Sequence, residues 1–174
     1  METIKIVINP KSLVPDSTWQ EFRKVRAIIE NENGEIALTS EAGKFIFPGG
    51  KCDEGEDNKS AIIRELKEET GMVFSPDDVH EVIIIESMYD DAVDYRTNTV
   101  RSRHTLTTYY FVKTKQRINE DNMSLTEGEI KENFKISFVS RDKLFEILRE
   151  EHREAVNWHL FYDENQAVVK NVLR

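Results

Sequence analysis

The sequence has little cysteine, no long apolar run and no excess of positive charge. Cys52 is the only cysteine among 174 residues, so the chain cannot form an internal disulfide, and a reducing compartment is expected. No apolar run approaches membrane-spanning length, and the first residues lack the apolar region of a signal peptide. These absences predict a cytoplasmic protein with no membrane partner.

The charge balance limits the partners further. The formal net charge is −9, which argues against non-specific nucleic-acid binding, because such binding depends on neutralising phosphates. A small polyanion can still bind where metal ions and a few arginines supply local positive charge. The length suits one domain with one core, and no repeat, low-complexity tract or linker divides residues 1–174.

Short β-rich segments precede and follow one central helical run. Strands are expected at residues 3–8, 22–30, 36–39, 45–47, 81–88, 106–114 and 134–139, with a hairpin within 22–39. Helices are expected after the central glycine pair, at 140–151, and in a tail from about residue 155. The polar stretches 89–103 and 116–133 are expected to be loops. This order of elements predicts α/β or α+β layering.

The stretch from Gly50 to Met72 carries the strongest local pattern. Asp57 or Asn58 suits the N-cap of a helix, and Gly71 suits the position just past its end. The apolar residues within this run recur at helical spacing and should face the core; they are Ile62, Ile63 and Leu66.

Three glutamates on the predicted helix conflict with its stability. Glu65 and Glu69 are like charges four residues apart, which costs about 0.2–0.5 kcal/mol. Glu68 and Glu69 lie near the C-terminus, where the helix dipole disfavours negative charge. Clustered carboxylates suit hard divalent cations, which prefer oxygen ligands. From these acids alone, a solvated acidic face is the alternative.

The spacing of the whole stretch is the more specific signal. It contains Gly50, Glu56, the triplet Arg64-Glu65-Leu66, the pair Glu68-Glu69, and Gly71. This spacing resembles the complete Nudix box, with no departure, and Phe47-Pro48-Gly49 resembles the usual lead-in. By this resemblance the chain is identified as a member of the Nudix hydrolase family. The resemblance implies an α/β/α sandwich with a mixed β-sheet, although only the box and its lead-in carry specific similarity.

The resemblance also implies an activity. Nudix hydrolases use Mg²⁺ or Mn²⁺ to cleave a nucleoside diphosphate linked to another moiety, by water attack at phosphorus. The expected partner is therefore a small nucleotide-diphosphate substrate. The alternative is a non-catalytic nucleotide-binding sensor, but such relatives commonly lose helix glutamates and this chain retains them.

The substrate stays open among dinucleoside polyphosphates, ADP-ribose, and oxidised or canonical nucleoside triphosphates. Tyr89 lies close to the region where diadenosine-polyphosphate hydrolases tend to carry a tyrosine. The oligomeric state is also open, with a homodimer as one alternative.

The resemblance also indicates which box residues would bind the metal. Glu65, Glu68 and Glu69 match the family's metal-binding glutamates, and Gly50 matches a position whose backbone carbonyl often joins them. Glu56 has a weaker claim, as an outer ligand. Arg64 is expected to orient a catalytic carboxylate through a bidentate pair.

The general base is open between a glutamate of the box and one on a later loop. Glu127 and Glu129 flank a glycine in the polar stretch 116–133 and are the loop candidates, with the larger effect expected at Glu127. For either one, a solvated surface acid is an equal alternative.

Five further residues have a weaker claim to function. Cys52 lies in the variable part of the box loop and is expected to be a spectator, and His104 is expected to be structural. Arg96, Arg101 and Arg103 could bind phosphates or a sugar, although scattered surface arginines are common.

Overall fold

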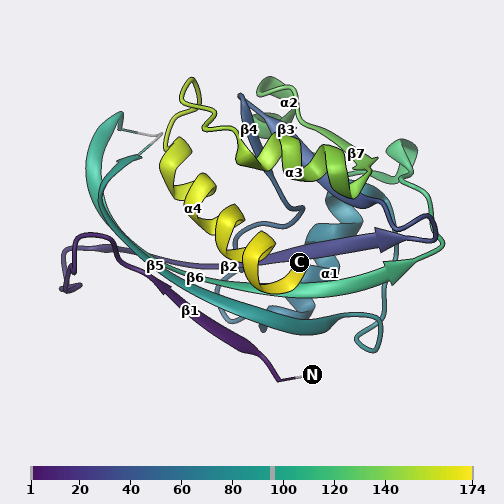
Figure 1. The fold of residues 1–174 in the computed structure, drawn as a ribbon, viewed down its shortest axis with the longest axis horizontal. Helices are drawn as coiled ribbons and strands as arrows, with labels where there is room; N and C mark the ends of the chain where they lie inside the picture. The colour runs from purple at the N-terminus through teal and green to yellow at the C-terminus, as the bar shows by residue number, and fades with distance from the viewer. Residues whose placement is uncertain (1, 95–96, 174) are drawn as a thin grey trace.

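One mixed β-sheet organises the part of the chain that the structure describes, residues 2–94 and 97–173. In this computed structural model the strands are β1 (Ile4–Ile8), β2 (Gln20–Asn31), β3 (Ile36–Glu41), β4 (Lys44–Ile46), β5 (His80–Asp94), β6 (Thr99–Thr114) and β7 (Lys135–Val139). The sheet order is β1-β5-β6-β2-β3-β4, and β7 pairs with β3 (Figure 1). Two pairs, β1–β5 and β2–β6, are parallel, and the other strand pairs are antiparallel.

Helices cover both faces of this sheet. The helical elements are α1 (Asn58–Thr70), η1 (Glu120–Asn122), α2 (Glu127–Lys131), α3 (Arg141–Arg149), α4 (Trp158–Val168) and η2 (Val169–Leu173). Helix α1 lies behind the sheet in Figure 1, and α3 and α4 lie in front of it. Among the described residues, no helix is long and apolar enough to cross a membrane.

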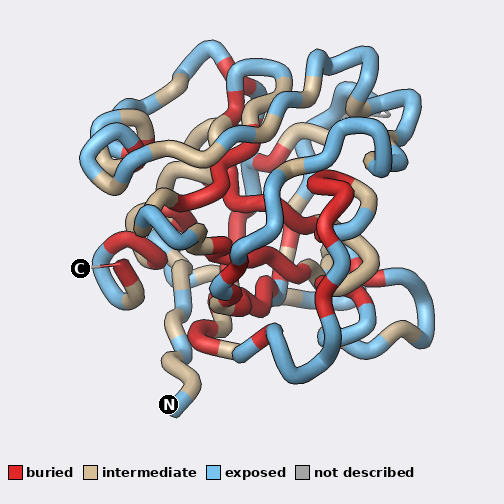
Figure 2. The backbone as a smooth tube through the Cα atoms, turned by 90° about the vertical axis from the view of Figure 1, so that its right-hand side faces the viewer, coloured by how far each residue is buried: buried red, intermediate tan, exposed pale blue. Residues whose placement is uncertain are grey.

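Two apolar clusters fill the two spaces between sheet and helices. Ile62 and Leu66 of α1 pack in one cluster with residues of β2, and Leu144 and Val168 of α3 and α4 pack in the other. Figure 2 shows the buried backbone running through the interior, with exposed segments around it. The predicted α/β/α sandwich with a mixed sheet is therefore confirmed.

The expectation of a loop at 89–103 is wrong for residues 89–94 and 99–103, which are strand. Strands β5 and β6 continue as an antiparallel ribbon, in which Ala92 pairs with Arg101 after an irregularity in the register. Tyr89 and Ala92 are buried against Leu160 of α4, so the ribbon has one apolar contact face despite its polar composition. That face comes from only two residues separated by two aspartates, which hides strand periodicity in the sequence.

The stretch 116–133 is also more structured than a loop. Helix α2 begins after Thr126, whose hydroxyl accepts a hydrogen bond from the Glu129 backbone N–H at 3.3 Å, while the Glu129 carboxylate accepts from the Thr126 N–H at 2.6 Å. This reciprocal arrangement is a capping box, and its Thr-x-x-Glu spacing is visible in the sequence.

Candidate active site

Strand β2 fixes the loop that leads into α1. The N–H of Ala27 donates to the Pro48 carbonyl at 2.8 Å, and the N–H of Val25 donates to the Gly50 carbonyl at 2.9 Å. Gly49 has a φ of +132°, and a Cβ there would lie 2.2 Å from the Val25 carbonyl oxygen. Only glycine therefore permits this close approach of the loop to the sheet.

The predicted ends of α1 are confirmed. Asp57 is the N-cap, and its Oδ1 accepts from the backbone N–H groups of Lys59 and Ser60, each at 3.0 Å. Gly71 ends the helix with a φ of 68°, and its N–H donates to the Lys67 carbonyl. These caps fix where the helix begins, and so which side chains face the loop.

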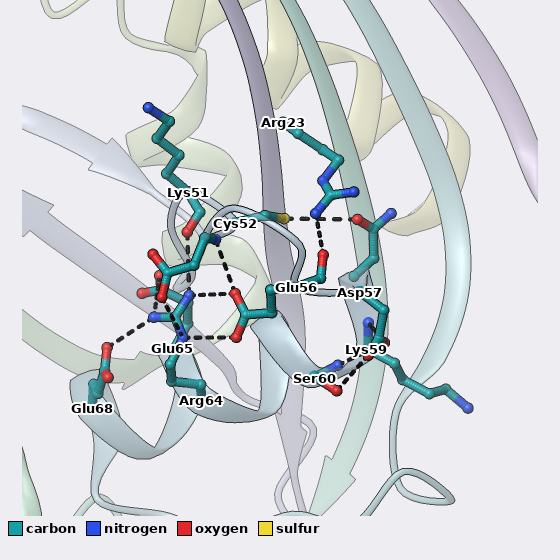
Figure 3. Close-up of polar contacts among 12 residues, drawn as sticks. Arg23, Lys51, Cys52, Glu56, Asp57, Lys59, Ser60, Arg64, Glu65 and Glu68 are labelled. Carbon is teal, nitrogen blue, oxygen red and sulfur yellow. Dashed lines mark hydrogen bonds and ion pairs between the residues drawn. The ribbon is translucent and has the colours of Figure 1, made fainter.

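Arg64 connects the polar residues of the box (Figure 3). Its Nε and Nη2 donate to the two carboxylate oxygens of Glu56, each at 2.9 Å. Its Nη1 donates to Glu65 at 2.9 Å and to Glu68 at 3.2 Å. Hydrogen bonds from Arg64 lower the pKa of Glu56 below its usual range. Arg64 therefore bonds three carboxylates, and its bidentate partner is Glu56; its role in orienting a catalytic carboxylate stays a prediction.

Glu69 is buried in the site, and Glu65 is partly buried. Glu69 is only 6% exposed and accepts a hydrogen bond from the N–H of Gly49 at 2.7 Å. Burial raises the pKa of Glu69 well above its usual value, and the charge of Glu65 raises it further. Burial also raises the pKa of Glu65, against the opposing effect of Arg64. A Cβ on Gly50 would lie 2.6 Å from the Glu65 oxygens, so glycine lets the loop approach this carboxylate.

The side chains of this site fit a divalent cation by their chemistry. Carboxylate oxygens are the donors that Mg²⁺ and Mn²⁺ prefer, and a cation would relieve the mutual repulsion of Glu65 and Glu69. The Gly50 carbonyl keeps a second lone pair besides the one used by β2. Within the described residues, however, no group of three or more His, Cys, Asp or Glu side chains is arranged to hold a metal. The side chains of Glu65 and Glu68 bond Arg64 instead.

Helix α2 brings one more carboxylate, that of Glu129, toward α1. The charge of Glu129 raises the pKa of both Glu65 and Glu69, so its carboxylate lies within electrostatic reach of them. Both capping contacts from Thr126 use the Oε2 atom of Glu129. Glu127 is exposed on the first turn of the same helix.

A polar pocket beside the box loop was not predicted from the sequence. Phe22 and Lys24 of β2 line it together with Lys51, and its volume is about 530 Å³. Burial lowers the pKa of Lys24 to about 8, and the like charge of Arg26 adds to this effect. The sequence did contain a sign of this pocket. Phe22, Lys24 and Arg26 alternate along the strand, so they share one side of it, and that side faces the core.

The three arginines considered from the sequence have different environments. Arg103 is buried and lines the pocket, whereas Arg101 is exposed on the β5–β6 ribbon. Arg96 lies outside the described residues. Of the two arginines that the structure describes, Arg103 is the one that lines a candidate binding site.

Tyr89 and Cys52 are both buried. The Tyr89 hydroxyl donates to Asp163 of α4 at 2.6 Å, so this tyrosine joins the sheet to a helix. Cys52 is buried, and burial raises the pKa of its thiol, which disfavours a reactive thiolate.

An α/β/α sandwich whose glutamate-bearing helix is entered through paired glycines defines a Nudix-type domain. The model of the NUDIX domain matches this chain over residues 21–159. The chain belongs to the Nudix family.

Curated relatives match over shorter regions. The 8-oxo-dGTP diphosphatase of Escherichia coli (strain K12) is 47% identical over 51 residues, which cover 26% of this chain and 40% of that protein. Nucleoside diphosphate-linked moiety X motif 6 of Xenopus laevis is 36% identical over 65 residues, covering 35% of this chain and 30% of that protein. The match therefore spans less than half the length of either relative.

Solved structures share the fold. The MutT protein of Methanosarcina mazei Go1 has a TM-score of 0.53 at 18% identity, covering 89% of this chain and 99% of that one. A bifunctional NMN adenylyltransferase/ADP ribose pyrophosphatase from Francisella tularensis has a TM-score of 0.55 at 19% identity, covering 90% of this chain and 42% of that one. At these identities the likeness concerns the fold alone.

Proposed function

We propose that this chain is a Mg²⁺- or Mn²⁺-dependent pyrophosphohydrolase that cleaves a nucleoside diphosphate linked to another moiety. The observation that carries the proposal is the convergence of Arg64, Glu65 and Glu69 where α1 meets the glycine loop. Membership of the Nudix family and the names of the relatives agree with it. When bound, a divalent ion would polarise the phosphate and activate the attacking water.

The residues of α1 divide the work in this proposal. Glu65, Glu68 and Glu69 are the candidate metal ligands, with the Gly50 carbonyl. Arg64 orients Glu65 and Glu68 through one nitrogen, while its other side is anchored by the fork on Glu56. Glu56 therefore acts through Arg64, which is consistent with an outer position. This preorganisation reduces the rearrangement required when substrate binds.

The proposed general base is Glu129, with Glu127 and the box glutamates as alternatives. Glu129 belongs to a separate element and reaches α1 electrostatically, so it can take a proton without being a metal ligand. Its capping contacts hold Oε2 and thereby fix the direction of the side chain.

A nucleotide-panel hydrolysis assay tests the proposal. Candidate substrates are 8-oxo-dGTP, ADP-ribose, a dinucleoside tetraphosphate and canonical triphosphates, each with Mg²⁺ and with Mn²⁺, scored by product identity. Hydrolysis should disappear with a chelator and return with excess metal. Activity that persists in the metal-free protein would remove the role of the α1 glutamates as ligands.

The same assay separates the enzyme from the non-catalytic sensor. A sensor would bind a nucleotide from the panel at equilibrium and return it unchanged. Retention of Glu65, Glu68 and Glu69 favours the enzyme, because a sensor has no use for the repulsion that these charges create.

A further inference from the structure

The pocket beside the box loop is built around the ring of Phe22. Its lining residues are Gln20, Glu21, Phe22, Lys24, Lys51, Asp94 and Arg103. The Nζ atoms of Lys24 and Lys51 lie 6.0 and 5.1 Å from the centroid of the Phe22 ring, and the Arg103 guanidinium carbon lies 4.8 Å from it. Three cations thus gather at one aromatic side chain in a space of ligand size.

The negative charges of this pocket are already engaged. Glu21 contacts the Nδ1 atom of His104 at 3.2 Å, and Asp94 accepts a hydrogen bond from Gln20 at 2.8 Å. Within the described chain, Lys24 and Lys51 have no carboxylate at ion-pairing distance. Lys24 is partly buried, so its charge is costly without a counterion, and an anion bound in the pocket would lower that cost.

Lys51 connects this pocket to α1. Its carbonyl oxygen accepts a hydrogen bond from Arg64 at 3.2 Å, so its backbone belongs to the box cluster. Its side chain extends away from Arg64 and Glu65 in Figure 3 and lines the pocket. The isolated bridge between Lys24 and Lys51 holds the two lysines side by side. A molecule bound here would therefore lie next to the loop that carries Gly50.

We propose that this pocket binds a phosphate group of the substrate, held by Lys24 and Lys51 beside Phe22. The identity of the bound molecule as substrate rests on the proposed function; the affinity of the pocket for phosphate does not. The inference selects substrates that carry a phosphate beyond the cleaved anhydride, such as nucleoside triphosphates or dinucleoside polyphosphates. Diphosphate-linked sugars with an uncharged end would leave the two lysines without a counterion.

Calorimetric titration with inorganic pyrophosphate, in a chelator and without metal, tests the pocket independently of hydrolysis. Lys24→Met and Lys51→Met should each weaken binding roughly 10- to 100-fold, the effect of losing a hydrogen bond to a charged group. Lys5→Met, an exposed strand lysine outside the pocket, should leave binding unchanged. Unaltered pyrophosphate affinity in both pocket variants would overturn the inference.

Two controls keep the outcomes distinct. Thermal unfolding verifies that each variant is folded, and the exposed position of Lys51 supplies a test even if Lys24→Met does not fold. Kinetics of a triphosphate and of ADP-ribose then extend the test to substrate choice: the variants should lose kcat/KM for the triphosphate selectively. If no substrate is hydrolysed but pyrophosphate binding depends on the lysines, the proposed function fails and the phosphate pocket stands.

Discussion

At the scale of single residues, Glu69 is a buried carboxylate whose pKa is raised by burial and by the charge of Glu65. Glu69→Gln should lower kcat by at least about 100-fold, the effect of losing one preorganised charged group. The variant should fold, because glutamine can still accept the Gly49 hydrogen bond and no longer repels Glu65. Steady-state kinetics and thermal melting measure both effects. A fully active Glu69→Gln enzyme would show that the metal ligands are misassigned.

The two acids of α2 give a matched pair for locating the base. Glu129→Gln should lower kcat by roughly 10²–10⁴-fold, the usual contribution of a general base. Glutamine can still complete the capping box with Thr126, so α2 should persist. Glu127→Gln serves as the control and should have the smaller effect, in contrast to the expectation from sequence, because the charge of Glu129 acts on Glu65 and Glu69 and raises the pKa of both. Near-normal kcat in the double variant would return the base to α1.

At the scale of elements, the C-terminal end of α1 requires glycine for two reasons, its backbone conformation and the space around it. Gly71 has a φ of +68°, and a Cβ there would lie 2.1 Å from the Asn119 carbonyl oxygen, whereas Gly34, at +75°, has nothing within 4 Å. Gly34→Ala should therefore cost about 1 kcal/mol of unfolding free energy through backbone strain alone. Gly71→Ala should cost roughly 2–5 kcal/mol, because overpacking adds to that strain. Equal losses in urea denaturation would contradict this account.

His104 joins three strands through two carboxylates. Its ring contacts Glu21 of β2 at 3.2 Å and Glu86 of β5 at 2.8 Å. Partial burial opposes protonation, but these carboxylates outweigh it and raise the pKa of His104. The two ion pairs of protonated His104 therefore stabilise the folded state fully below the unfolded pKa of about 6.5. This stabilisation is lost as the pH rises through the higher folded pKa.

Replacement of this histidine should show that pH dependence directly. The loss of unfolding free energy in His104→Gln should be larger at about pH 5.5 than at about pH 9, because only the protonated ring gains from the two carboxylates. Urea denaturation at both pH values measures it. An equal loss of unfolding free energy at the two pH values would show that the ring acts only by packing or by neutral hydrogen bonds.

At the scale of the whole molecule, a buried polar network joins α4 to the middle of the sheet. Glu164 of α4 accepts a hydrogen bond from Tyr109 of β6 at 2.7 Å and lies 3.6 Å from the Nε atom of Arg26 of β2. Glu164→Gln should lower the unfolding free energy by about 3 kcal/mol, because it leaves the buried Arg26 without its counterion. Glu146→Gln, in an exposed pair with Lys143, should change it by less than about 0.5 kcal/mol. Similar effects from the two variants would mean that the buried pair contributes no more than a surface pair.

The local sequence determined the parts of this protein whose structure depends on nearby residues. The capped helix from Asp57 to Gly71 and the hairpin between β2 and β3 follow from periodicity, caps and turns, which act over a few residues. The box spacing identified the family, and the roles of its glutamates remain predictions. The short cap of α2 was also present in the sequence, as Thr126 and Glu129.

Tertiary structure alone decided which distant residues meet. Residues 89–94 and 99–103 are strand because Tyr89 and Ala92 pack against Leu160 of α4, which is some seventy residues away and leaves no local period in the sequence. Lys24 and Lys51 form one pocket because the glycine loop bridges to β2. Periodicity shows that a residue faces inward but not what it faces, since that depends on strand order and register. For this reason the sequence identified helix α1 with its glutamates, and the fold revealed the pocket beside the box loop.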